Sequence, residues 1–310
     1  MILGVILIAD LSISFGLNKA VSQKVAQAKE AARPLEISIT TIQDGSCKDC
    51  FDLTNTLSSI KALNVKVLDE KTIDFSSQEA KELISRYQIE KVPTLVITGQ
   101  IEKFEDPAFE KKDGVMFFIG VNPPYLDLNK NKVIGLVKLT VIKDSTCTQC
   151  NDISPFINQF AALGVKIVSE QDLEYTQAAS IISKYGITKI PTVILSSDLE
   201  VYSTIADAWS SVGNRTSDGS YVLTNINPPY RDLVQGRITG LVKVIYISDK
   251  SCSSCYNVTL HKGILERLGL TVASEESYDI SDTKGKELVS KYKITQVPTV
   301  ILSPEAKDYP

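Results

Sequence analysis

The sequence predicts an α/β protein with mixed β-sheets, in which one unit of strands and helices occurs three times. The six Cys fall into three C-x-x-C pairs, and the first Cys of successive pairs are 100 and then 105 residues apart. An apolar, β-branched run begins twelve residues before each pair, and a strand that opens with Pro-Thr follows each pair. Length alone, at 310 residues, would instead suggest two domains.

The composition excludes several other classes of protein. Hydrophobic residues make up 43% and charged residues 23% of the chain, which is ordinary for a globular protein and not for a disordered one. A net charge of -4 gives no reason to expect a nucleic-acid partner. Because the chain has one His, a histidine-rich metal site is not expected either. The six Cys are therefore the informative residues.

Residues 2–17 are apolar apart from Asp10 and a few Ser, and they predict an N-terminal hydrophobic helix. As a helix this segment would span about 24 Å, short of the ~30 Å hydrocarbon core of a bilayer. We interpret residues 1–33 as an anchor or signal followed by a helical stalk, with membrane attachment through residues 2–17. A cleaved signal, a truncated start and a buried core segment stay open as alternatives.

Two signals for location disagree. Lys and Arg residues follow the apolar segment, which favours a cytoplasmic position for the rest of the chain. Paired Cys are instead typical of oxidising compartments. We expect a membrane-anchored or secreted protein on the extracytoplasmic side, and a cytoplasmic orientation stays open.

Each unit begins with a strand, a turn that contains an Asp, and the C-x-x-C pair. The first strands are expected at 35–42, 135–142 and 240–247. A helix with one apolar face follows the second Cys, and Leu53, Leu57 and Ile60 mark this face in the first unit. A short strand, a second helix and the Pro-Thr strand complete the part that all three units share.

The first two units continue beyond the Pro-Thr strand, through a loop and another strand, to an Asn-Pro-Pro-Tyr turn. The third unit stops at Pro310 without that final strand. The expected domains are residues 34–130, residues 131–234 and an incomplete third at residues 235–310. No C-terminal helix is visible in either complete unit. We expect the loops at 99–114 and 197–219, or a neighbouring unit, to cover that face of each sheet.

This order of elements and motifs resembles the thioredoxin fold, three times over residues 35–310. The Cys-to-Pro separations of 46, 44 and 46 residues support the resemblance. It implies tandem thioredoxin-like three-layer domains, as in multidomain protein disulfide isomerases. It also implies a cis proline packed near each Cys pair, at Pro93, Pro191 and Pro298. In the thioredoxin family the residue before that proline pairs with the substrate main chain, which here would be Val92, Ile190 and Val297.

The pairs themselves predict thiol–disulfide chemistry. A Cys in the first turn of a helix is close to the positive end of the helix dipole, which lowers the pKa of its thiol. A second Cys three residues later can then close a disulfide. The expected nucleophiles are Cys47, Cys147 and Cys252, and the expected resolving thiols are Cys50, Cys150 and Cys255. We expect no cofactor besides these redox-active disulfides, and the partners to be protein thiols or disulfides and an unidentified redox partner.

Several departures from the family pattern qualify this hypothesis. Thioredoxins carry a buried acidic residue six positions before the first Cys, where this chain has Thr41, Val141 and Tyr246. Asp44, Asp144 and Asp249 stand three positions before each first Cys instead. We interpret each as an exposed turn residue, and a role in proton transfer at the thiol stays open. The incomplete third unit is the one in which we least expect the Cys pair to turn over.

Two other functions stay open on the sequence. The first is a non-catalytic, membrane-attached scaffold or binding protein in which the disulfides are structural. The second is a zinc site made from two C-x-x-C pairs, which would require distant units to meet. A thiol-disulfide oxidoreductase acting on protein disulfides remains our main hypothesis, with the direction of transfer and the activity of each pair open.

Overall fold

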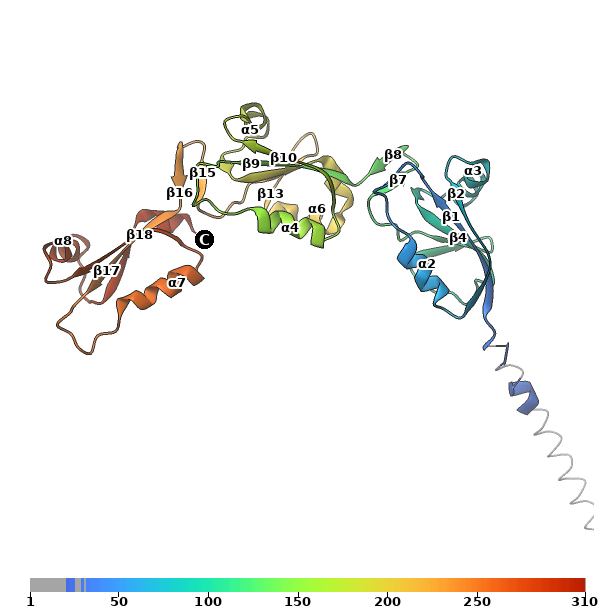
Figure 1. Cartoon of the computed structure of the whole chain (residues 1–310), viewed down its shortest axis with the longest axis horizontal. Helices are drawn as coiled ribbons and strands as arrows, with labels where there is room; N and C mark the ends of the chain where they lie inside the picture. Colours follow the sequence, from blue (N-terminus) through green and yellow to red (C-terminus); the bar gives the residue numbers. More distant parts are fainter. Residues whose placement is uncertain (1–20, 26–28, 31, 310) are drawn as a thin grey trace, which may run out of the picture. The chain divides into compact units, whose positions relative to one another are not determined.

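The computed structural model of the chain describes residues 21–25, 29, 30 and 32–309. Two compact units meet at the bond between Ile134 and Gly135 (Figure 1). The expected hydrophobic helix at residues 2–17 lies outside the described residues, and residues 21–25 are helical. None of the helices within the described ranges is long and apolar enough to cross a bilayer.

The first unit contains a five-stranded mixed sheet in the order β2-β1-β4-β6-β5. The central strand β1 is parallel to β2 and antiparallel to β4. The strands of this sheet are β1 (Leu35–Gln43), β2 (Val65–Asp74), β4 (Thr94–Gly99), β5 (Phe109–Lys112) and β6 (Val115–Phe118). The helices are α2 (Thr54–Lys61) and α3 (Gln78–Tyr87), and a second small sheet joins β3 (Lys91–Val92), β7 (Tyr125–Asp127) and β8 (Lys132–Ile134).

The second unit begins with a repeat of the same plan. Its main sheet has the order β10-β9-β12-β14-β13, and its small sheet the order β11-β15-β16. The strands are β9 (Leu136–Lys143), β10 (Lys166–Glu174), β11 (Lys189–Ile190), β12 (Thr192–Leu195), β13 (Gly213–Arg215), β14 (Tyr221–Leu223), β15 (Tyr230–Asp232) and β16 (Arg237–Thr239). The helices are α4 (Ser154–Ala162), α5 (Ala179–Tyr185), η1 (Ser197–Val201), α6 (Ser203–Ala208) and η2 (Trp209–Ser211).

The third repeat, also in the second unit, has a three-stranded sheet in the order β18-β17-β19. Its central strand is again parallel to the strand that follows the first helix and antiparallel to the Pro-Thr strand. Its elements are β17 (Leu241–Ser248), η3 (Val258–Leu260), α7 (His261–Arg267), β18 (Thr271–Asp279), α8 (Thr283–Tyr292), β19 (Thr299–Leu302) and η4 (Pro304–Asp308).

Each repeat therefore has the mixed sheet of a thioredoxin-like fold with helices on its two faces. In the second repeat, Phe160 of α4 belongs to one buried cluster, and Ala178, the N-cap of α5, belongs to another, each with residues of the sheet. The β-branched alternation along β9 sends Val141 to the first cluster and Ile142 to the second. The mixed α/β class expected from the sequence is thus confirmed.

The loop between β12 and β14 replaces the missing C-terminal helix in the second repeat. Leu199, Tyr202 and Ile205 from this loop are buried in the same cluster as Phe160 of α4. Trp209 is 2% exposed and stacks on the Phe160 ring at 6.3 Å between centroids. The expectation that residues 197–219 cover this face is confirmed for this part of the loop, and Trp209 has a packing role.

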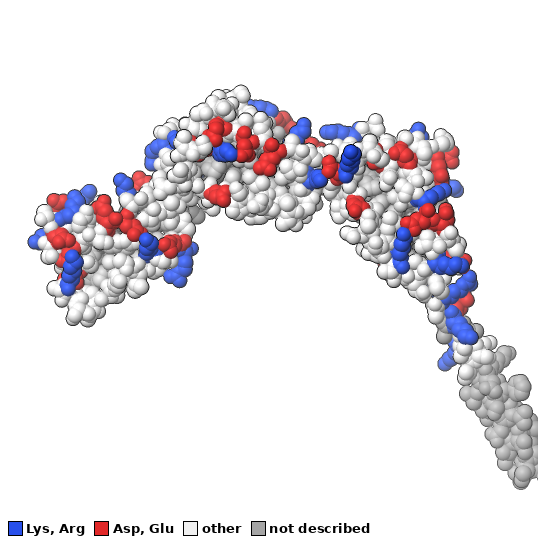
Figure 2. All heavy atoms as spheres, in the orientation of Figure 1, with Lys and Arg blue, Asp and Glu red and all other residues white. Residues whose placement is uncertain are grey.

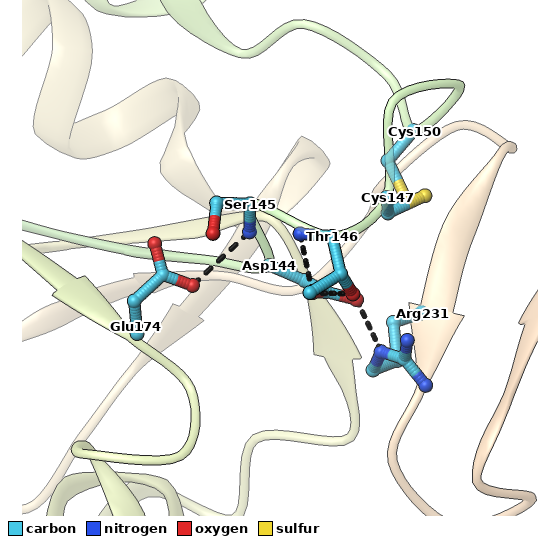
Figure 3. Close-up of a disulfide and its surroundings, with 7 residues drawn as sticks. All are labelled: Asp144, Ser145, Thr146, Cys147, Cys150, Glu174 and Arg231. Carbon is cyan, nitrogen blue, oxygen red and sulfur yellow. Dashed lines mark hydrogen bonds and ion pairs between the residues drawn. A yellow bond between two sulfur atoms is a disulfide. The ribbon is translucent and has the colours of Figure 1, made fainter.

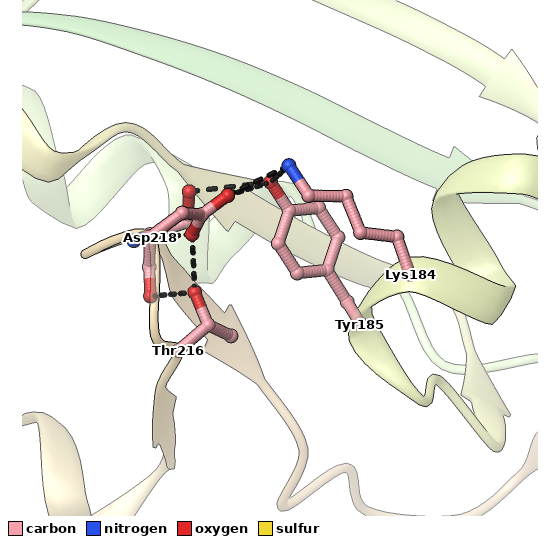
Figure 4. Close-up of polar contacts among 5 residues, drawn as sticks. Lys184, Tyr185, Thr216 and Asp218 are labelled. Carbon is pink, nitrogen blue, oxygen red and sulfur yellow. Dashed lines mark hydrogen bonds and ion pairs between the residues drawn. The ribbon is translucent and has the colours of Figure 1, made fainter.

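The end of the same loop is attached to α5 by a polar cluster (Figure 4). The Asp218 carboxylate accepts hydrogen bonds from Tyr185 Oη at 3.0 Å and from Thr216 Oγ1 at 2.6 Å, and lies 2.7 Å from Lys184 Nζ. Hydrogen bonds from Lys184 and Thr216 hold the pKa of Asp218 well below its ordinary value. The cluster fixes the β13–β14 turn against the helix.

Candidate redox site

All six Cys are joined within their own C-x-x-C pair. The S–S distances are 2.02 Å for Cys47–Cys50, 2.02 Å for Cys147–Cys150 and 2.08 Å for Cys252–Cys255. Each sulfur-bearing residue is half-buried. The structure also places a cis peptide bond before Pro93, Pro191 and Pro298, as the family resemblance implies. In the second repeat, Cys147, Cys150 and Pro191 line one cavity of about 220 Å³.

The pairs lie in a turn and not in the first turn of a helix, so the sequence-based placement was wrong. The helix α2 begins at Thr54, four residues after Cys50, and α4 begins at Ser154, four after Cys150. The Asp at the second position after each of these pairs accounts for the delay, because its side chain favours a local turn: Asp52 accepts a hydrogen bond from the Thr54 N–H at 2.8 Å. The helix dipole therefore does not act directly on the first Cys.

Two carboxylates fix the C-x-x-C turn in each repeat. In the second repeat, Asp144 Oδ1 accepts from the Thr146 N–H at 3.0 Å, and its carbonyl accepts from the Cys147 N–H at 3.1 Å. Glu174, at the end of β10, accepts from the Ser145 N–H at 3.0 Å. The equivalent carboxylates elsewhere are Asp44 and Asp74 in the first repeat and Asp249 and Asp279 in the third.

The second repeat adds an arginine to this arrangement (Figure 3). The Arg231 side chain reaches from β15 to the turn that carries Cys147, and its Nε donates a hydrogen bond to Asp144 Oδ2. The Asp144 side chain is 1% exposed and that of Arg231 is 19% exposed. Asp144 is thus buried, unlike the exposed turn residue that the sequence suggested. Leu126 occupies the position of Arg231 in the first repeat.

The charge state of Asp144 follows from these contacts. Burial raises the pKa of the carboxyl, but hydrogen bonds from Thr146 and Arg231 outweigh burial and lower the pKa below its ordinary value. Asp144 is therefore ionised at neutral pH and paired with a cation. A carboxylate without such a partner would oppose formation of a thiolate at the neighbouring Cys.

In the first two repeats, a hairpin of the chain pairs with the two-residue strand that precedes the cis proline, β3 or β11, which we call the cis-proline strand. Val92 pairs with Leu126 of β7, and Ile190 pairs with Arg231 of β15. The same hairpins reach the other side of the site, because the Phe51 N–H donates to the Pro124 carbonyl at 2.7 Å. The Asn151 N–H donates to the Pro229 carbonyl at the same distance. Sequence reasoning missed this contact, although the repeated Pro-Pro-Tyr turn was its signal.

The third repeat is open at this place. Among residues 32–309, which the structure describes without a gap, no strand pairs with Val297, and Gln296 is exposed. The Tyr256 hydroxyl, which follows Cys255, donates to the Pro298 carbonyl at 3.0 Å and lies 3.1 Å from Nε2 of His261. The Tyr256 side chain thus connects the C-x-x-C turn to the cis proline in the third repeat, whereas a hairpin connects them in the other two repeats.

The remaining sequence expectations concern acids and metals. Thr41, Val141 and Tyr246 are buried, so no carboxyl occupies the buried position six residues before the first Cys. Within the described residues, the structure brings together no group of three or more His, Cys, Asp or Glu that could hold a metal ion.

Acidic and basic side chains are interspersed on the face drawn in Figure 2.

No protein-family model matches the chain, and no curated protein matches it. Among solved structures, the alkylhydroperoxide reductase component AhpF of Enterococcus faecalis is similar at 16% identity and a TM-score of 0.18, over 55% of this chain and 82% of that one. A protein disulfide oxidoreductase from Aeropyrum pernix matches at 13% identity and a TM-score of 0.16, over 55% and 77%. Human ERp44 matches at 10% identity and a TM-score of 0.13, over 86% and 77%. Scores this low carry no argument about function, so the thioredoxin-like assignment rests on sheet order, the C-x-x-C pairs and the cis prolines.

Proposed function

We propose that this protein is a thiol-disulfide oxidoreductase that acts on protein thiols and disulfides through its C-x-x-C pairs. The observation that carries the proposal is a half-buried disulfide in a turn, with a cis X-Pro bond 44 to 46 residues later, found three times in one chain. A half-buried sulfur remains within reach of an incoming thiolate, which exchange requires.

The proposed reaction is two successive exchanges. A substrate thiolate attacks the sulfur of Cys47, Cys147 or Cys252, and the thiolate of the second Cys of that pair leaves. A second substrate thiolate then attacks the substrate sulfur of the mixed disulfide, and the first Cys leaves as a thiolate. Two electrons pass from the substrate to the pair, and the reverse sequence reduces a substrate disulfide. These steps require no cofactor besides the disulfides, and a separate redox partner must reset the pair.

A second candidate function is a non-catalytic scaffold with structural disulfides. A hairpin that pairs with the segment before the cis proline favours it for the first two repeats. The carboxylates at the C-x-x-C turn favour it for all three. Reduction potentials decide between the two functions. Values below about -300 mV for all three pairs would identify structural disulfides.

The organisation and location of the protein belong to the same proposal. We propose three thioredoxin-like domains, at residues 34–130, 131–234 and 235–310, behind an N-terminal segment that attaches the protein to a membrane. Paired Cys support a location outside the cytoplasm, where disulfides persist. Accessibility of the six Cys to an impermeant thiol reagent in intact cells, before and after reduction, tests this location.

Trapping of the mixed disulfide tests the proposed activity. Full-length variants Cys50→Ser, Cys150→Ser and Cys255→Ser are each incubated with glutathione disulfide and analysed by mass spectrometry of Cys-containing peptides. We expect a glutathione adduct on the first Cys of the altered pair, because its resolving thiol is gone. Absence of an adduct in all three variants would refute the oxidoreductase proposal.

A further inference from the structure

The hairpin of the second repeat occupies main-chain groups that an extended substrate would need. The Leu233 N–H donates to the Thr188 carbonyl at 2.8 Å, and Ile190 faces Arg231 two residues further along the same antiparallel ladder. Hydrogen-bonded pairs alternate along such a ladder, so Ile190 and Arg231 also form a hydrogen-bonded pair. The residue before Pro191 is therefore already paired within the chain.

The hairpin is attached to both sides of the disulfide. On one side it pairs with β11, and Lys189 Nζ lies 4.6 Å from the centre of the Tyr230 ring. On the other side, the carbonyl of Pro229 accepts from the Asn151 N–H, directly after Cys150. A polypeptide that approached along the cis-proline strand would have to displace these bonds.

Arg231 connects these two attachments. Its main chain pairs with Ile190, and its side chain bonds to Asp144, whose carbonyl accepts from the Cys147 N–H. The guanidinium also lies 5.2 Å from the centre of the Tyr175 ring. Since both members of the Arg231–Asp144 pair are mostly buried, the pair is held in one geometry and shielded from solvent.

We propose that Arg231 is a specificity-determining residue of the second site, which holds β15 over the cis-proline strand and so admits small thiols and disulfides but excludes an extended polypeptide. The inference rests on the proposed thiol-disulfide exchange. The cavity of about 220 Å³ that Cys147 and Cys150 line provides the route for a small reagent. In the overall exchange, the Cys147–Cys150 dithiol and glutathione disulfide give the protein disulfide and two molecules of glutathione.

The test uses the full chain with only its second pair, in which Cys47, Cys50, Cys252 and Cys255 are replaced by Ser. The reduced protein is mixed with glutathione disulfide or with a ten-residue extended peptide whose single Cys carries glutathione. Acid-quenched samples are analysed by mass spectrometry to give a rate constant for each probe. We expect Arg231→Leu to raise the ratio of the peptide rate to the glutathione disulfide rate about tenfold.

The matched control is Arg215→Leu, which removes an exposed arginine of the same repeat that pairs with Glu200. We expect it to leave the ratio unchanged. The double variant Arg231→Leu, Asp144→Asn removes the hairpin contact without leaving a buried unpaired carboxylate, and it replaces the single variant if circular dichroism shows that the latter fails to fold.

The two rate constants distinguish a failure of the Arg231 role from a failure of thiol-disulfide exchange at the second pair. If neither probe reacts with the parent chain, thiol-disulfide exchange itself is refuted at this pair. If both probes react and the rate ratio stays within twofold in the Arg231→Leu chain, or in the double variant that replaces it, exchange stands and the role of Arg231 is wrong.

Discussion

The second and third C-x-x-C turns have the same backbone and differ in what covers them. In both, an Asp three residues before the first Cys accepts from the turn, and an acidic residue at the end of the parallel strand accepts as well. A hairpin lies over the second turn, and its Arg231 donates a hydrogen bond to Asp144 of that turn. The third turn has Tyr256, 49% exposed, and no strand on its cis-proline segment within the described residues.

This difference separates two properties of each site, the chemistry of the Cys pair and the access of a substrate to it. In the proposed function, the C-x-x-C turn and the cis proline supply the exchange chemistry, and both are present in all three repeats. We infer that access to the disulfide depends on a segment about 80 residues further along the chain, at residues 228–232 for the second pair. The third pair, which the sequence analysis least expected to turn over, is the one whose cis-proline segment pairs with no strand within the described residues.

The largest expected effect is the loss of stability when the Arg231–Asp144 pair is removed. Arg231→Leu leaves the Asp144 carboxylate buried without a cation, which we expect to cost about 3 kcal/mol of unfolding free energy. Trp209, the one Trp in the chain, is buried in the second repeat, so its fluorescence during urea unfolding at pH 7 reports on this repeat.

Arg215→Leu is the matched control for this measurement. Its exposed pair with Glu200 should contribute about 0.5 kcal/mol or less. Equal costs for the two substitutions would show that the Arg231–Asp144 pair does not hold the hairpin, and the contrast with the third repeat would lose its basis.

The next effect concerns access to the third pair. Two full-length chains are compared, one with only Cys147–Cys150 and one with only Cys252–Cys255. Because the segment before Pro298 is unpaired within the described residues, we expect the ratio of peptide to glutathione disulfide rates to be about tenfold higher for the third pair, equivalent to about 1.4 kcal/mol. A ratio that is the same for both pairs would mean that the hairpin does not control access.

Local sequence patterns predicted the parts of the fold that depend on local chemistry. The β-branched runs became β1, β9 and β17, shifted by one residue at most at either end. The Pro-Thr strands and their cis prolines also appeared where the family resemblance put them. The start of the first helix was misplaced, because the side chain of the Asp or Asn two residues after each pair accepts from the N–H two residues further on, in a turn that delays the helix.

Contacts between distant residues could not be predicted in this way. Arg231 and Asp144 are 87 residues apart, and nothing in the periodicity around either residue indicates the other. The pairing of β11 with β15 is of the same kind, since a two-residue strand leaves no recognisable pattern. Only the repetition of Pro-Pro-Tyr in two units signalled that this turn has a shared structural role.

A smaller effect is expected at Tyr256. Removing its hydroxyl in Tyr256→Phe leaves the Pro298 carbonyl to solvent and should cost about 0.5 to 1 kcal/mol, because this hydrogen bond is exposed. Amide hydrogen exchange over residues 294–302 should become up to about fivefold faster. Tyr278→Phe, whose hydroxyl donates to the exposed Glu276, is the control and should leave that segment unchanged. Unaltered exchange in Tyr256→Phe would show that this side chain does not organise the third site.

The smallest effect is the response of the second repeat to acid. The pKa values of Asp144 and Asp218 are both lowered in the folded chain, so these groups bind protons more weakly than in the unfolded chain. Their contribution to stability is therefore complete above the ordinary Asp pKa near 4 and is lost as the pH falls through the lowered values. We expect Trp209-monitored stability to be flat with respect to these groups between pH 5 and 7 and to fall below about pH 4. Asp218→Asn should make this acid loss shallower, since the exposed pair with Lys184 no longer titrates, while the Asp144 contribution persists. An identical acid profile in the parent and Asp218→Asn chains would show that Asp218 contributes nothing, and would leave the response to Asp144 and Asp152, whose pKa values are also lowered. Of these two, Asp144 is bonded to Arg231, whereas Asp249 of the third site has no arginine partner among the described residues.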